Sequence, residues 1–178
     1  HDFYAAQTTE GPEGERVMIA WMHTWGRPLV TNDLGHKWYG QMTLPRLLKQ
    51  GENGLRQVLP AGILNSFDDI EIGQVIQGPS KLSLKLDDSL DLKLGTDQDY
   101  LQFGYDKESQ EVYIDRGHLD IQQTGEEEWS TIRRSVTVEA EELLIMIDTN
   151  CVEIFVNNGQ EVLTSTYYVE GQKTLNTL

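Results

Sequence analysis

The stretch KLSLKLDDSLDLKL, residues 81–94, decides the fold, because leucines alternate with polar residues on both sides of a short acidic break. Leucine occupies every second position of residues 81–86 and again of residues 89–94. Successive side chains of a β-strand point to opposite faces, so each run places its leucines on one face. The Asp87-Asp88 pair between the runs is typical of a turn. The stretch therefore predicts two half-buried strands separated by a turn.

The same period of two continues through most of the chain. It recurs in Tyr100–Tyr105, Glu111–Ile114, Ile132–Val138 and Cys151–Val156. Asn157-Asn158-Gly159 follows the last of these runs and is a hairpin signal. Residues 138–147 have some helix propensity, but they end in a β-like apolar run, so we predict a turn followed by a strand. Short strands spaced in this way predict an all-β chain built around an antiparallel β-sandwich.

The first part of the chain differs from the rest in composition. It holds three of the four tryptophans, Trp21, Trp25 and Trp38, and three of the four histidines. Residues 16–22 and 37–44 are apolar on both faces, which predicts two fully buried strands. We place a domain boundary near residues 50–65, and divide the chain into residues 1–60 and 61–178.

Charge and cysteine content exclude several classes of function. The 178 residues carry 29 acidic and 14 basic side chains, a net charge of −15. Nucleic-acid binding needs a basic surface, so neither nucleic acid nor an anionic membrane is an expected partner. No apolar run reaches the roughly 18 to 20 residues of a membrane span. The single cysteine, Cys151, excludes a disulfide within the chain and a thiolate metal site. A reducing cytoplasm agrees best with this, although exported bacterial proteins also often lack disulfides.

Four stretches, taken together in their order and spacing, resemble one enzyme family. They are Asp2–Gln7, Arg16–Met22 with Trp25, Trp38–Arg46 and Val152–Gly159. The chain is similar to the C-terminal part of the β-fructofuranosidases of glycoside hydrolase family 32. This resemblance implies an N-terminal five-bladed β-propeller followed by a β-sandwich. Residues 1–60 would then be the last propeller blade with its linker, and residues 61–178 the sandwich.

The resemblance also implies where the chemistry lies. Retaining glycosidases need two carboxyl groups roughly 5 to 5.5 Å apart. The family carries its nucleophile in Trp-Met-Asn-Asp-Pro-Asn-Gly, its transition-state stabiliser in Arg-Asp-Pro and its acid/base in Glu-Cys, and none of these strings occurs here. We therefore expect a C-terminal fragment of an enzyme that hydrolyses sucrose or sucrose 6-phosphate. The fragment itself would be inactive, with no catalytic residue, no metal and no cofactor.

A finer resemblance concerns the location of the enzyme. Residues 31–40, TNDLGHKWYG, look more like those of intracellular bacterial sucrose-6-phosphate hydrolases than those of secreted invertases. We therefore expect a cytoplasmic bacterial protein. Its partners would be a fructoside, bound through the propeller of the parent enzyme, and that propeller domain itself.

Three residues are candidate substrate contacts within the parent enzyme. Trp25 ends the Trp-Met-x-x-Trp pattern, whose last tryptophan lies beside the fructose site in the family; the alternative is a core tryptophan of the blade. Asp2 and Tyr4 could support the pocket floor, but a structural role, a hydrogen bond at the strand start and core packing, is the commoner one for such residues. His23 and Arg27 could contact a sugar phosphate. A solvated loop position is the commoner role for both.

The acidic residues of the sandwich part are expected to be surface groups. Asp115, Asp120, Asp148 and Glu153 invite a search for a carboxylate pair. Glu153 alternates with apolar neighbours and is therefore expected to face outward. The run Glu126–Glu128 is expected to form a solvated loop. The histidines, His118 included, show no metal-ligand spacing.

Two other functions remain open beside the enzyme fragment. The chain could be a free-standing carbohydrate-binding β-sandwich, for which Trp129 is the tryptophan available in the sandwich part. The sandwich could instead be purely structural, stabilising the propeller or mediating a homo-oligomer. Blade strands without their neighbours would expose edges that favour self-association.

Overall fold

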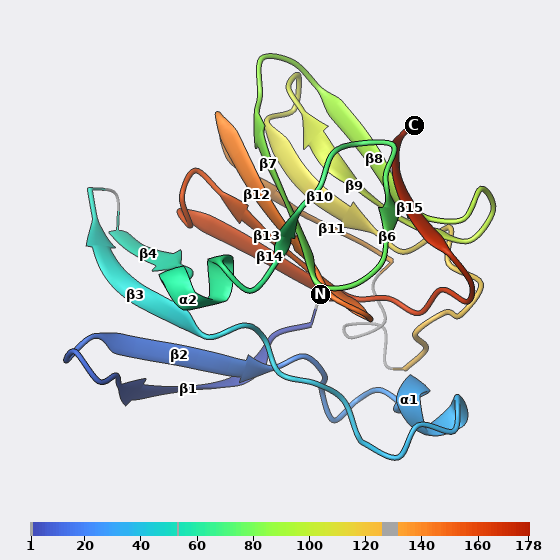
Figure 1. The fold of residues 1–178 in the computed structure, drawn as a ribbon, viewed down its shortest axis with the longest axis horizontal. Helices are drawn as coiled ribbons and strands as arrows, with labels where there is room; N and C mark the ends of the chain where they lie inside the picture. Colours follow the sequence, from blue (N-terminus) through green and yellow to red (C-terminus); the bar gives the residue numbers. More distant parts are fainter. Residues whose placement is uncertain (1, 53, 126–131) are drawn as a thin grey trace.

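The first module of the chain is a four-stranded antiparallel sheet (Figure 1). The computed structural model describes residues 2–52, 54–125 and 132–178. The strands of the first sheet, in the order in which they pair, are β1 (Tyr4–Glu10), β2 (Arg16–Trp21), β3 (Arg46–Gly51) and β4 (Gly54–Val58). Each strand pairs with the next one along the chain, which is the arrangement of a propeller blade.

The long connection between β2 and β3 differs from the prediction of a buried strand over residues 37–44. It holds a short helix, α1 (Val30–Asp33), and then an irregular segment with a single bridge between Trp21 and Met42. Gly40 adopts a φ of +71°, and an added Cβ would lie 2.6 Å from Nε1 of Trp21. This left-handed turn interrupts any extended strand here. Trp38 and Met42 are exposed, so this prediction was wrong.

The prediction for residues 16–22 was right in secondary structure and wrong in burial. The segment forms β2, but Arg16 is exposed and its central residues are only half-buried. Ala20, near the end of the strand, and Met22, just after it, are buried. The described residues therefore cover this sheet incompletely.

The second module is a β-sandwich, which follows α2 (Ala61–Leu64). One sheet has the strand order β11-β10-β9-β8-β15-β6 and the other β14-β13-β12-β7-β5. The strands of the first sheet are β6 (Val75–Ile76), β8 (Leu90–Gly95), β9 (Tyr100–Asp106), β10 (Glu111–Asp115), β11 (Arg133–Thr137) and β15 (Lys173–Thr177). Those of the second are β5 (Asp68–Asp69), β7 (Ser80–Lys85), β12 (Glu142–Ile147), β13 (Cys151–Val156) and β14 (Glu161–Thr166). Every described pairing is antiparallel except that of β5 with β7.

The main hydrophobic core lies between the two sandwich sheets and is built by alternate residues of the strands. Leu101, Phe103 and Tyr105 of β9 are buried together, as the period of two predicts. The opposite sheet contributes alternate residues of β13 to the same core, namely Val152, Ile154 and Val156. The all-β architecture expected from the sequence is therefore confirmed.

Two further predictions about the sandwich are confirmed. Residues 138–147 form a non-helical segment followed by the strand β12. Asn157 and Asn158 have positive φ values and, with Gly159, lie in the turn that joins β13 to β14. The predictions for Glu126–Glu128 and Trp129 concern residues outside the described ranges.

A second, smaller hydrophobic cluster joins the linker, residues 59–67 between β4 and β5, to the outer face of the sandwich. It contains Leu59 and Phe67 from the linker, and Met146 and Phe155 from β12 and β13. The end of the first module is also fastened directly, because the Gln57 amide donates a 2.9 Å hydrogen bond to the Gly159 carbonyl. The two modules therefore share a packed boundary.

Candidate functional site

Trp25 lies in the loop that follows β2, and 81% of its surface is exposed. Its ring meets that of Trp21 edge to face, with centroids 5.5 Å apart. Trp21 in turn meets the His23 ring at 5.0 Å. Edge-to-face contacts of this kind are favourable and leave most of the Trp25 ring open. The ring could therefore pack against the C–H face of a sugar.

Tyr4 and Asp2 lie beside this loop in different surroundings. Tyr4 is half-buried at the start of β1 and is paired with Trp21 in the register of β1 and β2. Asp2 is buried, with 2% of its surface exposed. The structure thus brings Tyr4 next to the base of the aromatic group. It places Asp2 beneath the loop and away from the surface on which Trp25 lies.

The Asp2 carboxylate is the centre of a buried polar network between the two modules. It accepts hydrogen bonds from Arg27 Nη1 at 2.7 Å and from Arg116 Nη1 at 3.2 and 3.4 Å. The amide and hydroxyl of Thr166 donate to it at 2.6 and 2.7 Å. Burial alone would raise the pKa of the Asp2 carboxyl. The two arginines and the Thr166 amide outweigh burial and hold this pKa below its ordinary value.

His23 and Arg27 are buried, which contradicts the expectation that both are solvated loop residues. His23 Nε2 lies 2.9 Å from the Arg27 carbonyl oxygen, and Arg27 Nη2 lies 3.3 Å from His23 Nδ1. Burial lowers the pKa of His23, and the neighbouring Arg27 charge lowers it further. The two side chains close the loop onto itself at the point where it displays Trp25.

Sequence reasoning missed the sandwich residues that complete this network. Arg116 and Thr166 contact Asp2. The Gln123 side-chain amide donates to the Thr166 carbonyl at 2.9 Å, and its Oε1 lies 3.0 Å from the Thr166 hydroxyl oxygen. None of these residues belongs to a recognisable motif. Arg116 lies 114 residues from Asp2, so nothing in the local pattern could indicate the contact.

Glu153 faces the first module and is buried, so the prediction that it faces solvent was wrong. Its carboxylate pairs with Arg46 at 2.5 Å and accepts the Leu44 amide at 2.6 Å. Arg46 also donates to the Gln57 side chain at 2.7 Å. Burial raises the pKa of the Glu153 carboxyl, and Arg46 and the Leu44 amide offset only part of that effect. The outer face of β13 is thus covered by a segment more than one hundred residues away.

The other sandwich acids do not converge on one site. Asp115 accepts the Gly117 amide and lies 3.7 Å from Arg133, and Asp148 accepts the Thr149 amide. Asp120 is exposed, but its amide donates at 3.0 Å to the Asp99 carboxylate in the β8–β9 turn. The pKa of Asp99 is raised by burial and by neighbouring acids. In the part of the chain that the structure describes, no cluster of histidine, cysteine or acidic residues could hold a metal ion.

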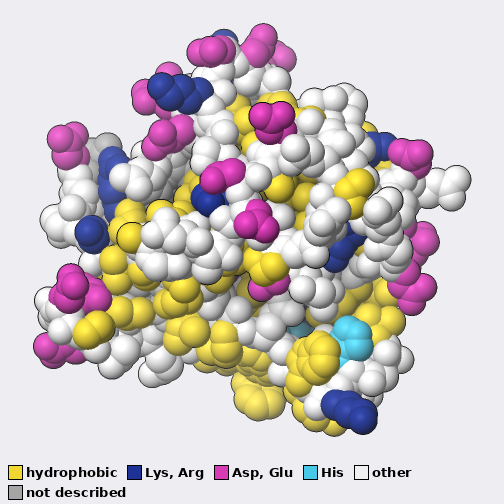
Figure 2. All heavy atoms as spheres, in the orientation of Figure 1, with side chains coloured by type: hydrophobic (Ala, Val, Ile, Leu, Met, Phe, Trp, Pro, Cys, Tyr) yellow, Lys and Arg dark blue, Asp and Glu magenta, His cyan; other side chains and the backbone are white. Residues whose placement is uncertain are grey.

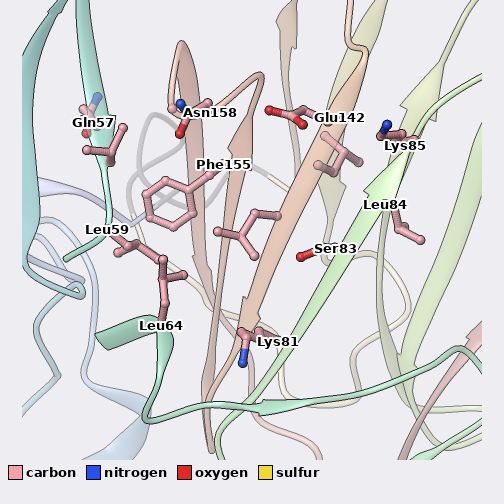
Figure 3. A pocket seen from close by; sticks show the side chains of 14 residues that line it. Gln57, Leu59, Leu64, Lys81, Ser83, Leu84, Lys85, Glu142, Phe155 and Asn158 are labelled. Carbon is pink, nitrogen blue, oxygen red and sulfur yellow. The ribbon is translucent and has the colours of Figure 1, made fainter. Parts of the chain in front are cut away.

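A groove of about 520 Å³ runs between the linker and the outer sheet of the sandwich (Figure 3). One wall is formed by the end of β4, the following Leu59 and Leu64 of helix α2, and the β7–β12–β13 face forms the floor. Lys85 and Glu142 lie at the polar rim. Phe155 lines the groove, but only 2% of its surface is exposed. The groove therefore offers an apolar floor with little aromatic surface for a sugar ring.

Apolar side chains are concentrated on part of the face drawn in Figure 2. They gather over the first sheet and the connection that follows it, whereas acidic side chains are spread over the sandwich and also lie at the outer end of the first sheet. Trp25, Trp38, Tyr39 and Met42 are among the exposed apolar residues of the first module. Within the described ranges, no helix is long and apolar enough to span a membrane.

Curated relatives match nearly the whole chain. It is 28% identical to the sucrose-6-phosphate hydrolase of Escherichia coli over 97% of its own length, and 30% identical to that of Vibrio alginolyticus over 95%. It spans only 38% and 35% of those two proteins. The raffinose invertase of Escherichia coli is 29% identical and is spanned over 37% of its length.

Solved structures share the fold at lower sequence identity. Sucrose-6-phosphate hydrolase from Lactobacillus gasseri superimposes with a TM-score of 0.75 at 20% identity, over 98% of this chain and 38% of that one. The β-fructofuranosidase BmSUC1 of Bombyx mori gives 0.74 at 21% identity, over 99% and 38%. These enzymes have a propeller followed by a β-sandwich, which agrees with the two modules described above.

Two family profiles match in succession. The profile described as the glycosyl hydrolases family 32 N-terminal domain matches residues 1–59, and the family 32 C-terminal profile matches residues 67–177. The second match alone covers more than half of the chain. With the fold and the relatives in agreement, the chain belongs to glycoside hydrolase family 32.

Proposed function

We propose that this chain is the C-terminal part of a β-fructofuranosidase that hydrolyses sucrose or sucrose 6-phosphate with retention of configuration. The main support is that the family 32 N-terminal and C-terminal profiles match in succession, over residues 1–59 and 67–177. The chain spans little more than a third of the length of its curated relatives. Several of those relatives are sucrose-6-phosphate hydrolases. Sucrose 6-phosphate is therefore the first substrate to test.

The proposed reaction is a double displacement through a covalent fructosyl intermediate. It requires one carboxylate as nucleophile and one carboxyl group as acid/base, roughly 5 to 5.5 Å apart. The family motifs that carry these groups do not occur in this chain, so the chain alone is proposed to be inactive. Proton transfer and nucleophilic attack by carboxyl groups need no cofactor. The reaction would take place in the bacterial cytoplasm.

Within the parent enzyme, Trp25 is the proposed contact of this chain with the fructoside. Its exposed ring offers an apolar face to the sugar, while the catalytic carboxyl groups of the preceding blades would act on the glycosidic bond. Tyr4 would support the base of the aromatic group through Trp21. Asp2 would act through Arg27, because its own carboxylate is already occupied by buried donors.

The sandwich is proposed to be structural. Its support comes from the two ion-pair networks at the module boundary, Asp2 with Arg27 and Arg116, and Glu153 with Arg46. The alternative of a sugar-binding sandwich has less support, since Phe155 in the groove between the linker and the sandwich is almost fully covered.

The test compares this chain with the protein encoded by the complete reading frame. The complete protein should release fructose from sucrose or sucrose 6-phosphate, and NMR should show that the first product has the substrate's anomeric configuration. The 178-residue chain should release none. Adding a separately produced N-terminal part should restore activity. A complete protein inactive on both sugars, or an inverted first product, would contradict the proposal.

A matched pair of variants tests the role of Trp25. In the complete protein, Trp25→Ala should raise KM for the fructoside more than Trp25→Phe, which keeps an aromatic face. Stacking on an aromatic ring contributes to substrate and transition state alike, so kcat should change less than KM. Equal kinetic constants for Trp25→Ala and the wild type would show that Trp25 does not contact the substrate.

A further inference from the structure

The loop that carries Trp25 is fixed by buried neighbours on both sides of it. His23, Thr24 and Arg27 are all at least nine-tenths buried, whereas Trp25 is 81% exposed. The contacts between His23 and Arg27, at 2.9 and 3.3 Å, close the loop. The outward position of Trp25 is therefore set by what holds His23 and Arg27 in place.

What holds them is largely the sandwich. Arg27 binds Asp2, and Asp2 is bound from the sandwich side by Arg116 and Thr166. Gln123 in turn donates a hydrogen bond to the Thr166 carbonyl. This chain of contacts leads without interruption from strand β14 and residue 116 to the loop.

A close backbone approach adds to this network. A Cβ placed on Gly125 would lie 2.6 Å from the Gly26 carbonyl oxygen and 3.0 Å from the Arg27 Cα. Gly125 also has a φ of +151°. The loop therefore packs against sandwich backbone at Gly26 and Arg27, the two residues that follow Trp25, and only glycine at position 125 leaves room for that approach.

We propose that Arg116, Gly125 and Thr166 of the sandwich are positioning residues for the substrate contact made by Trp25. The sandwich, on this inference, sets fructoside affinity from outside the pocket by clamping the loop through Asp2 and Arg27. The inference rests on the proposed function, in which Trp25 contacts the sugar.

The composition of the cluster makes Arg116 a suitable residue to change. The cluster holds two guanidinium groups, Arg27 and Arg116, around the single Asp2 carboxylate. Burial lowers the pKa of His23, so this ring adds no charge near neutral pH. Arg116→Met keeps most of the side-chain volume and leaves one arginine paired with one carboxylate. The variant therefore loosens the clamp without leaving a buried charge alone.

The kinetic test is a double-mutant cycle in the complete protein. Arg116→Met should raise KM for the fructoside by about tenfold with little change in kcat, as expected when uniform binding is lost. In Trp25→Ala, the same substitution should add almost nothing, because its effect passes through Trp25. Arg116→Lys should restore part of the affinity. Arg133→Met, which removes another sandwich arginine, one stacked on Tyr113, is the control and should leave KM unchanged.

A second readout uses the 178-residue chain and does not depend on activity. Acrylamide quenching of Trp25, taken as the difference between each protein and its Trp25→Phe counterpart, should increase in Arg116→Met and not in Arg133→Met. If the complete protein cleaves no fructoside, the proposed function fails. The quenching measurements alone then test whether the sandwich holds the Trp25 loop in place. Unchanged quenching, or additive effects of Arg116→Met and Trp25→Ala on KM, would overturn the inference that Arg116 positions Trp25.

Discussion

At the scale of single residues, the boundary between the modules depends on two buried carboxylates. Asp2 and Glu153 each lie against at least one arginine of the other module or of the adjoining loop. Attraction between buried charges roughly balances their desolvation, but removing one partner leaves the other buried and unpaired. Replacing either carboxylate should therefore cost far more than the removal of a surface ion pair.

Glu153→Ala should lower the free energy of unfolding by about 3–5 kcal/mol, because Arg46 would remain buried without its partner. Urea denaturation followed by circular dichroism measures the change. Asp97→Ala is the control, since the Asp97 side chain is 97% exposed in its pair with Lys93. An exposed pair of this kind contributes at most about 1 kcal/mol. Similar losses in the two variants would show that Glu153 has no special role.

The lowered pKa of Asp2 predicts a dependence of stability on pH. The folded state favours the ionised carboxylate, so its contribution is fully present above the ordinary pKa of 3.8 and is lost as the pH falls through the lower folded-state value. Asp2→Asn should be less stable than the wild type near neutral pH, and the difference should shrink below about pH 4. Urea titrations across this range test the prediction, and a constant difference at all pH values would contradict it.

The same residues show what sequence reasoning cannot see. Alternation along β13 correctly places Val152, Ile154 and Val156 in the core. It predicts that Glu153 faces water only if nothing covers the other face of the sheet. Arg46 covers that face from 107 positions away along the chain. Neither the burial of Glu153 nor that of Asp2 has a local signal, because both depend on contacts between distant segments.

At the scale of elements, the period of two predicts most of the sandwich strands and little about their partners. β7 and β8 follow one another across Asp87-Asp88, yet they belong to different sheets. Each of the two strands buries its leucine face. Alternation of leucines cannot show whether the connection between the strands is a hairpin within one sheet or a crossing from one sheet to the other. The failure over residues 37–44 has another cause. Apolar composition alone suggested a strand there, and the left-handed turn at Gly40 prevents it.

Gly159 is a position at which the backbones of the two modules touch directly. Its φ is +79°, and an added Cβ would lie 2.1 Å from the Gln57 carbonyl oxygen. Gly171 has a similar φ of +88° with open space around it. Gly171→Ala should therefore cost about 1–2 kcal/mol from backbone strain alone.

Gly159→Ala should cost about 1–3 kcal/mol more than that control, because β4 must move away from the β13–β14 turn. Urea denaturation of the two variants gives the difference directly. The displaced strand should also make the linker around Leu59 more susceptible to protease. Equal losses of stability would mean that the contact between Gln57 and Gly159 is not maintained in solution.

At the scale of the whole molecule, two opposing surface properties govern association. The net charge of −15 repels one copy from another. Trp25, Trp38, Tyr39 and Met42, exposed on the first module, offer apolar surface that another copy could cover. Charge repulsion is screened by salt, whereas apolar attraction is not, so ionic strength should decide which property prevails.

The 178-residue chain should therefore self-associate, and more strongly as salt rises from about 0.1 to 1 M, where the screening length falls from about 10 to 3 Å. Analytical ultracentrifugation over a range of protein concentrations measures the effect. Trp38→Gln with Met42→Gln should weaken association, because both side chains belong to the exposed apolar surface. Leu178→Gln, which removes a comparably exposed apolar side chain from the sandwich, should not. A monomer at every salt concentration would show that this surface is insufficient to bring two copies together. Equal weakening by the two sets of substitutions would place the contact elsewhere than on the first module.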